Sequence, residues 1–499
     1  MPTGLLRFLL PASAGVTESR AQRAYLTGPD QVPWPCRIRL DNGQLVVERQ
    51  VSDSGKFHIP WPVEGHGEVV LSTATLMECD RPYHLPVELA RGKVNQVRNQ
   101  VAEWQSIGLL VPDKVDAVLK RALGHLALAV TTQHDPQVAA EHAERAIVAA
   151  VDAADLLVAC YCEQALASRH RGTARLRTLL GAPLGAGLLD PPAAAAFLKA
   201  FNSAIVPMAW RQVEAAEGHR QWEISDRQIE WCEAQGLKVV SGPLVQLDRL
   251  ALPDWLCLWE GDFRSIHSFV SDYVQAAVTR YRGRVHVWQC AARMNVPDAL
   301  SLTEEQRLQL TVRAIEAARQ ADPTTLLSVS FDQPWAEYMS KSAPDLSPLH
   351  FADALVRAGL DLGAVGLEIN MGYQPGGSYL RDRLECSRLL DLWSYLGLPL
   401  HLLLSVPGGQ AAAATGAASP SRPAPAEAGL SGGWTADSQA AWIKHYLPMM
   451  VAKPAVQAIF WNQFEGEAGE FPHAGLFDRA AGPKPALAAL AMLRKKHLE

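Results

Sequence analysis

A repeated alternation of short β-prone apolar segments with helical segments, starting near residue 173, most constrains what this chain can fold into. Strands are expected at 178–184, 204–208, 238–241, 285–290, 326–331, 364–369, 401–406 and 458–461. Apolar residues at helical spacing separate them. Alternating strands and helices build a parallel sheet, and eight such units are the number that closes a (β/α)8 barrel. The sequence therefore predicts an α/β fold with a C-terminal (β/α)8 TIM barrel over 173–499.

Two other segments precede the barrel, and one interrupts it. Residues 1–85 contain short β-type runs and a hairpin signal at Asp41-Asn-Gly43, which predicts a β-sandwich-like domain. Residues 86–172 change to a helical period and are expected to form a helical connector. The low-complexity loop 408–433 is rich in Ala, Gly, Pro and Ser and follows the seventh strand. It is either a lid or an inert insertion, and its composition favours the insertion.

The composition excludes several classes of function. The 499 residues carry a formal charge of −6 from 46 basic and 52 acidic side chains, so nucleic acid and anionic membrane surfaces are not expected partners. No apolar run approaches the ~20 residues of a membrane span. The apolar segment 5–10 is interrupted by Arg7 and is expected to be a first strand rather than a signal peptide.

The cysteines and histidines give no sign of a cofactor. Eight cysteines are scattered without a Cys-x-x-Cys motif, which favours reduced thiols in the core and a cytoplasmic location. We find no convincing metal-ligand spacing and no glycine-rich phosphate loop. The sequence therefore predicts no metal and no cofactor, and it leaves the oligomeric state open.

Short motifs along the barrel region occur in a characteristic order. They are Phe201-Asn202, Met208-Ala-Trp210, Leu252-Pro-Asp-Trp255, Arg319-x-x-Asp322-Pro323, Gly475-Leu-Phe-Asp478 and Pro483-Lys-Pro485-Ala486. In order and spacing they resemble glycoside hydrolase family 10, the endo-β-1,4-xylanases, over residues 179–493. The resemblance implies a barrel that acts on a β-1,4-linked poly- or oligosaccharide, with one glutamate as acid/base and a second as nucleophile.

The positions that correspond to those two glutamates depart from the family pattern. The fourth strand of the family ends in Trp-Asp-Val-Val-Asn-Glu, whereas this chain has Trp288-Gln-Cys-Ala-Ala292-Arg293. At the nucleophile position of the seventh strand stands Leu404. A retaining glycosidase needs two carboxyl groups about 5–5.5 Å apart. Arginine stays protonated near neutral pH and leucine has no nucleophilic group, so the standard mechanism is not expected.

Other carboxylates fall near strand ends. Glu368 lies in an apolar sixth strand, where a charge is costly unless it is paired, and Arg293 or Arg381 are candidate partners. Glu465 and Glu467 follow the eighth strand. One interpretation is a relocated catalytic pair of Glu368 with one of these two glutamates. The other is a structural Glu368–Arg293 ion pair, with two exposed glutamates in the loop.

Further residues are candidates for binding saccharide. Four aromatic side chains near strand ends offer either stacking platforms for sugar rings or packing at the barrel mouth: Trp288, Trp335, Tyr373 and Trp461. Polar candidates are Arg293, Asp332, Gln333, Asn370, Asn462, Gln463 and His473.

Three functions remain open from the sequence. The first is a non-catalytic or strongly altered barrel that binds polysaccharide. The second is an active, divergent hydrolase that uses Glu368 and a carboxylate of the eighth-strand loop. The third is a protein-binding scaffold. The surroundings of Glu368 discriminate between the first and second functions. An ion pair between Glu368 and Arg293 opposes catalysis, whereas an open cleft with a second carboxylate near Glu368 favours catalysis.

Overall fold

The computed structural model describes residues 4–11, 15–50, 52–342, 346–410, 423–427, 429–466 and 469–499. Half of the predicted loop 408–433, namely residues 411–422 and 428, therefore lies outside the described residues. Within the described ranges, no helix combines the length and apolarity that a bilayer crossing requires.

The second half of the chain is the predicted barrel. Eight parallel strands form a closed ring, because the third strand pairs with the fourth through Val240 and Val287 while the first pairs with the eighth. In chain order the strands are β9 (Leu179–Pro183), β10 (Ser203–Val206), β11 (Lys238–Ser241), β13 (Val287–Ala292), β14 (Leu326–Asp332), β15 (Ala364–Asn370), β17 (Leu400–Ser405) and β19 (Val456–Trp461). Each overlaps one of the segments expected from the sequence, so the fold prediction is confirmed.

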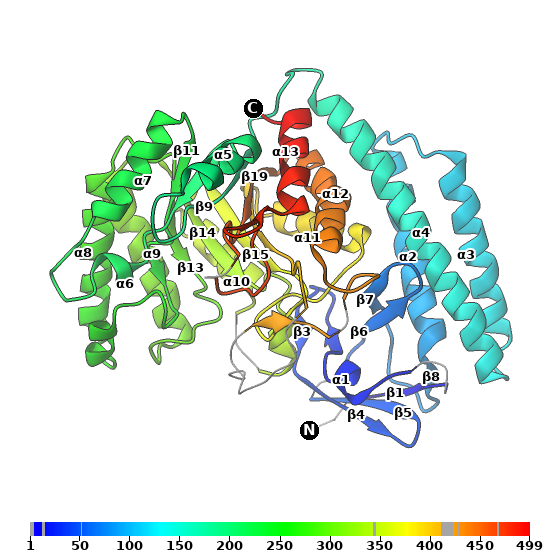
Figure 1. The fold of residues 1–499 in the computed structure, drawn as a ribbon. Helices are drawn as coiled ribbons and strands as arrows, with labels where there is room; N and C mark the ends of the chain where they lie inside the picture. The colour runs from blue at the N-terminus through cyan, green and yellow to red at the C-terminus, as the bar shows by residue number, and fades with distance from the viewer. Residues whose placement is uncertain are drawn as a thin grey trace.

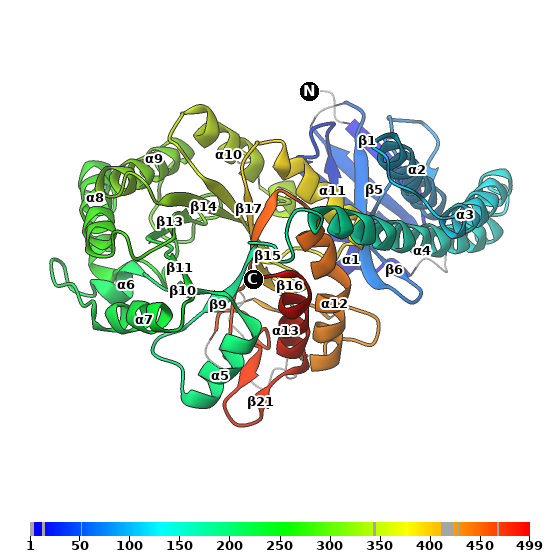
Figure 2. The same ribbon diagram turned by 90° about the horizontal axis from the view of Figure 1, so that it is seen from above.

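Helices surround this ring, as the view down the barrel in Figure 2 shows. They are α5 (Pro191–Ala200), α6 (Trp210–Val213), α7 (Glu223–Ala234), α8 (Phe263–Arg280), α9 (Glu304–Ala321), α10 (Pro348–Arg357), α11 (Arg383–Ser394), α12 (Ala436–Ala452) and α13 (Pro485–His497). All residues of β13 and β15 are buried, as expected for strands covered on both faces. Ile205, Val287 and Phe460 belong to a separate cluster of buried apolar side chains contributed by the barrel strands.

The N-terminal region consists of two four-stranded sheets that share one apolar core, including Phe8, Leu45 and Trp61. One sheet contains β1 (Gly4–Leu9), β4 (Cys36–Asp41), β5 (Gln44–Arg49) and β8 (Tyr83–His84), and the other contains β2 (Tyr25–Thr27), β3 (Pro33–Trp34), β6 (Lys56–Val63) and β7 (Gly67–Ser72). The β4–β5 hairpin turns at Asn42 and Gly43, which both have positive φ as this tight turn requires.

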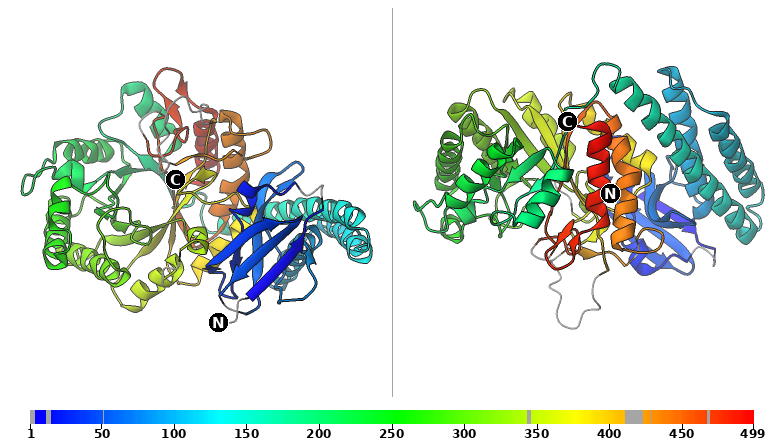
Figure 3. Two further views of the ribbon diagram at one scale, coloured as in Figure 1. Left: turned by 90° about the horizontal axis from the view of Figure 1, so that it is seen from below. Right: turned by 45° about the horizontal axis from the view of Figure 1, so that its top comes forward.

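Three long helices follow the sheets: α2 (Leu85–Ser106), α3 (Asp113–Thr131) and α4 (Pro136–Arg169). Figure 1 shows them packed against one another beside the blue N-terminal sheets, and Figure 3 shows the sheets next to the barrel. Buried contacts join these parts. Lys93 Nζ lies 2.8 Å from both carboxylate oxygens of Asp382, and Val70 N donates to Leu380 O at 2.8 Å. The loop after β15 is therefore fastened to the N-terminal region.

Candidate functional site

The carboxyl ends of the barrel strands meet at one face, and Arg293 stands at the end of β13 on this face. Its φ of 56° places it in the left-handed region, which is unfavourable for a residue with a side chain. Gln333, directly after β14, has a φ of 48°. Backbone strain of this kind is concentrated at functional sites, where surrounding contacts hold it in place.

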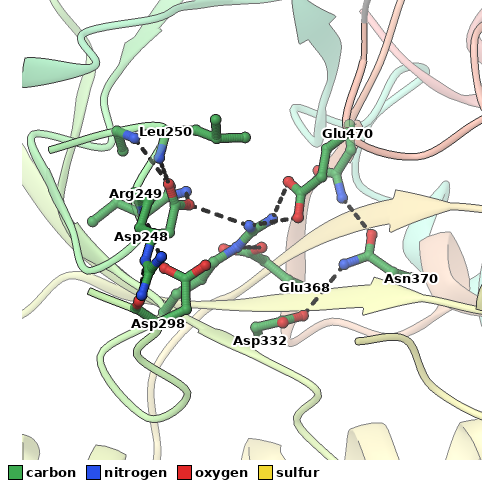
Figure 4. Close-up of polar contacts among 12 residues, drawn as sticks. Asp248, Arg249, Leu250, Asp298, Asp332, Glu368, Asn370 and Glu470 are labelled. Atoms are coloured by element: carbon green, nitrogen blue, oxygen red, sulfur yellow. Dashed lines mark hydrogen bonds and ion pairs between the residues drawn. The ribbon is translucent and has the colours of Figure 1, made fainter. Parts of the chain in front are cut away.

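Carboxylates from three different segments converge on Arg293. Its Nε donates to Glu368 Oε2 at 2.9 Å, and its two terminal nitrogens each donate to one oxygen of Glu470 at 2.8 Å. Asp248 Oδ2 lies 3.4 Å from Nη1. Figure 4 shows Glu470 and Asp248 on opposite sides of this cluster. One guanidinium thus joins β15, the loop after β19 and the loop that follows β11.

The electrostatics keep Arg293 charged. Burial alone would lower the pKa of this guanidinium, but the nearby carboxylates of Glu368, Glu470 and Asp332 outweigh burial and hold that pKa well above its usual value. Glu368 is also fixed from a second direction, since Ser330 Oγ donates to its Oε1 at 2.9 Å. The geometry is that of an ion pair supported by further hydrogen bonds, which a buried charge requires.

Asp332, the last residue of β14, is the second buried carboxyl group at this face and is 6% exposed. Burial raises its pKa to about 7, and the carboxylates of Glu368 and Glu470 add to this rise while Arg293 opposes it. Asn370 Nδ2 donates to Asp332 Oδ1 at 3.3 Å, and the backbone N–H of Gln333 donates at 2.9 Å. Asp332 can therefore hold a proton near neutral pH.

A pocket of about 220 Å³ lies beside the cluster. Its lining residues come from the loops and ends of the first four strands and of the sixth, seventh and eighth strands: Pro183, Ile205, Pro207, Gly242, Pro243, Gln246, Gln289, Arg293, Glu368, Leu403, Asn462, Gln463, Gly469, Glu470 and Phe471. The lining combines amide and carboxylate side chains with apolar ones. Such a mixture suits a ligand with many hydroxyl groups and some apolar surface.

The structure brings together four of the residues selected from the sequence, since Arg293, Glu368, Asn462 and Gln463 all line this pocket. Asp332 and Asn370 bond to each other next to it, and Asn462 Nδ2 donates to Asn370 Oδ1 at 2.8 Å. Gln333 adjoins Asp332.

Sequence reasoning missed two carboxylates of this cluster, Glu470 and Asp248. The available signal was charge balance. A buried arginine that replaces a carboxylate at the end of a strand calls for acidic partners in neighbouring loops, and both of these residues lie in such loops.

The prediction for the loop glutamates needs correction. Both oxygens of Glu465 accept hydrogen bonds from Arg479, at 3.1 and 2.8 Å, and Glu465 does not line the pocket that contains Glu368. Glu467 lies outside the described residues. Among the described residues of the eighth-strand loop, the carboxylate that approaches Glu368 through Arg293 is that of Glu470.

The four aromatic candidates are buried, with exposed fractions of 0% for Trp288 and Tyr373, 1% for Trp461 and 7% for Trp335. Trp461 Nε1 donates to Ala474 O, and Tyr373 Oη donates to Pro472 O, both at 2.8 Å. Their rings pack in the core and offer no face to a sugar, so the interpretation as stacking platforms is wrong.

Two further expected residues also lie elsewhere. His473 is exposed and is not among the residues that line the pocket, and desolvation lowers the pKa of its imidazole. Arg381, a possible partner of Glu368, instead pairs with Glu337 at 2.7 Å. Across the described ranges, no set of three or more His, Cys, Asp or Glu side chains is arranged to hold a metal ion.

A closed parallel barrel with a polar pocket at the carboxyl ends of its strands belongs to a class whose members carry their sites at this face. Residues 178–366 match the model of glycosyl hydrolase family 10. Over these residues the barrel is therefore similar to that family. Endo-1,4-beta-xylanase B of Thermotoga neapolitana is 23% identical over 308 residues, which cover 58% of this chain and 80% of that protein.

Solved structures of xylanases are also similar to this chain. Xylanase 10B of Thermotoga maritima has a TM-score of 0.48 at 16% identity, covering 67% of this chain and 97% of that one. Xylanase 10B of Thermotoga petrophila RKU-1 in complex with xylobiose has the same TM-score and identity, covering 66% and 96%. A structure described as GH10 from Paenibacillus barcinonensis has a TM-score of 0.49 at 17% identity, covering 67% and 98%.

Proposed function

We propose that the barrel mouth binds a β-1,4-linked saccharide without hydrolysing it by the two-glutamate mechanism. The observation that carries this proposal is the Arg293 cluster. The end of β13 presents a guanidinium that holds Glu368 and Glu470 in hydrogen bonds of 2.9 and 2.8 Å. At the nucleophile position inferred from the sequence stands Leu404, which is fully buried.

The cluster opposes carboxylate catalysis for a physical reason. A retaining glycosidase requires one carboxyl group to protonate the leaving oxygen and another to attack the anomeric carbon. Glu368 and Glu470 instead direct oxygens at the same cation. Withdrawing either one would leave charge uncompensated in a largely buried site, which costs several kcal/mol. The cluster therefore acts as a fixed wall of the pocket.

Saccharide binding is supported by the family of the barrel and by the chemistry of the pocket. Gln246, Gln289, Asn462 and Gln463 contribute side-chain amides to its lining. Amides both donate and accept hydrogen bonds, which matches the hydroxyl groups of a sugar. The apolar part of the lining, from residues such as Phe471, suits the C–H faces of a sugar ring.

The test combines release and binding. Purified protein and its Glu368→Gln variant are incubated with a panel of β-1,4-linked polysaccharides and with short oligosaccharides made from them. Reducing ends are measured, and binding of the oligosaccharides is followed by calorimetry. We expect binding by the wild type with no release above the buffer blank. Release that disappears in Glu368→Gln would contradict the proposal.

One observation favours a second candidate, an active and divergent hydrolase. The raised pKa of Asp332, about 7, is suitable for a general acid, and Asp332 is paired in register with Glu368 on adjacent strands. In that case both Asp332→Asn and Glu368→Gln would abolish release. If the folded protein neither releases reducing ends nor binds saccharide, the result would favour the protein-binding scaffold.

A further inference from the structure

Negative charge exceeds positive charge at the barrel mouth. The carboxylates of Glu368, Glu470 and Asp248 lie 2.9, 2.8 and 3.4 Å from the guanidinium of Arg293. Asp332 is a further carboxyl group nearby, and its pKa is raised by burial and then by the charges of Glu368 and Glu470. Of the charged residues that line the pocket, Arg293 is positive, whereas Glu368 and Glu470 are negative. Among the described residues, the wall of the pocket therefore carries a net negative charge.

The hydrogen-bonding capacity of this wall is also one-sided. Arg293 already uses its Nε and both terminal nitrogens to donate to carboxylates. Each oxygen of Glu368 and Glu470 accepts one hydrogen bond, from Arg293 or from Ser330. A carboxylate oxygen has lone pairs for a second one. The cluster therefore offers a ligand more acceptors than donors.

A buried amide is an independent sign that this site suits a donor. Gln463 lines the pocket and is 8% exposed. Its Nε2 donates to the backbone oxygen of Glu465 at 2.9 Å. Its Oε1 is buried and receives no hydrogen bond from any residue that the structure describes. A buried acceptor without a donor is costly, so a ligand that donates hydrogen bonds to this wall would relieve that cost.

We infer that the mouth prefers a β-1,4-linked saccharide that carries a protonated amine, such as a chain of glucosamine, over neutral or acidic saccharides. This inference rests on the proposed function and names the class of its ligand. An ammonium group is positively charged and has donors but no acceptor, so it matches both the charge and the acceptors of the wall. A uronic acid would bring a like charge to these carboxylates, which selects against it.

The experiment compares three disaccharides that share the β-1,4 linkage and differ in the group at carbon 2 of each sugar. Cellobiose has a hydroxyl group, the glucosamine disaccharide has an ammonium group, and N,N′-diacetylchitobiose has an uncharged acetamide. Each is titrated calorimetrically into the wild-type protein at pH 6. We expect the glucosamine disaccharide to bind at least tenfold more tightly than either of the other two.

Glu470→Gln and Glu465→Gln are a matched pair of variants. Both glutamates lie in the loop after β19 and accept two hydrogen bonds from an arginine, but of the two Glu470 lines the pocket and Glu465 does not. Glutamine keeps the size of the side chain and removes its charge. Glu470→Gln should reduce the preference to less than threefold, whereas Glu465→Gln should leave it unchanged. Asp248→Asn removes a charge 3.4 Å from Arg293 and should also lower the preference, which keeps the test decisive if Glu470→Gln does not fold.

The outcomes separate this inference from the proposed function. Equal binding of the three disaccharides by the wild type would overturn the preference for an amine and leave saccharide binding intact. A preference that persists unchanged in both Glu470→Gln and Asp248→Asn would overturn the role of the carboxylates. If the folded wild type binds none of these disaccharides and no oligosaccharide of the β-1,4-linked panel, the proposed function and the inference are overturned together.

Discussion

Two buried arginines at the same face of the barrel have different surroundings. Arg381, after β15, pairs with Glu337 at 2.7 Å and donates to Tyr25 Oη at 3.0 Å, and its guanidinium lies 5.8 Å from the ring centre of Trp335. Arg293 faces Glu368, Glu470 and Asp248. Arg381 is thus paired with one carboxylate, whereas Arg293 is surrounded by three carboxylates.

The two arginines also differ in how exposed their side chains are. The side chain of Arg381 is 3% exposed and belongs to the junction with the N-terminal sheets, since Tyr25 lies in β2. The side chain of Arg293 is 13% exposed and lines a pocket. A balanced, closed pair is what a structural junction requires. An unbalanced cluster on a strained residue beside a pocket is what a ligand site requires. The comparison therefore favours a structural role for Arg381 and fits the proposed binding role of Arg293.

The largest expected effect is from Arg381→Met. Because this variant leaves the Glu337 carboxylate buried without its cation, we expect the free energy of unfolding to fall by about 3–5 kcal/mol. Urea unfolding followed by tryptophan fluorescence measures it. Arg284→Met is the matched control, since it removes a half-buried arginine at the surface whose pair with Glu233 contributes about 0–1 kcal/mol. Equal losses in the two variants would contradict the assignment of Arg381 to a buried junction.

Arg293→Met should have a smaller effect on stability and a larger one on ligand binding. Water enters through the pocket and partly solvates the carboxylates left behind, so we expect a loss of about 1–3 kcal/mol at pH 7. Without the guanidinium the negative charge of this cluster has no cation to balance it, and acidic pH reduces that charge. The loss should therefore grow as pH rises and shrink toward pH 4. Urea unfolding at pH 4.5, 6 and 7.5 measures this trend, and a loss independent of pH would count against the cluster.

The sequence predicted the parts of this comparison that depend on local pattern. Strand β15 was recognisable because an apolar run with β-prone residues is bounded by turn signals, and Glu368 was recognisable as a buried carboxylate in need of a partner. Glu470 and Asp248 were not found, because their contacts with Arg293 join segments 177 and 45 residues apart in the chain, and the closed barrel decides which of its loops meet. The prediction that Trp288 offers a stacking face was wrong for another reason. An aromatic residue near a strand end can point into the core or into the mouth, and composition does not specify which.

The smallest expected effect on stability is from Asp332→Asn. Whether this variant gains or loses stability matters most for the comparison of the two arginines. The folded-state pKa of Asp332, about 7, is above the ~3.9 of an unfolded chain, so its stabilising contribution is complete below the unfolded value and is lost as pH rises toward the folded value. Asparagine has the same shape and can accept from Asn370 and the Gln333 backbone N–H, but it does not ionise. We therefore expect no change in unfolding free energy near pH 4 and a gain of about 1–2 kcal/mol near pH 8. A loss at pH 8 would show that ionised Asp332 is favourably paired with Arg293. The uncompensated negative charge around Arg293 would then be smaller than the contacts indicate. The two arginines would then differ only in that Arg293 lines a pocket.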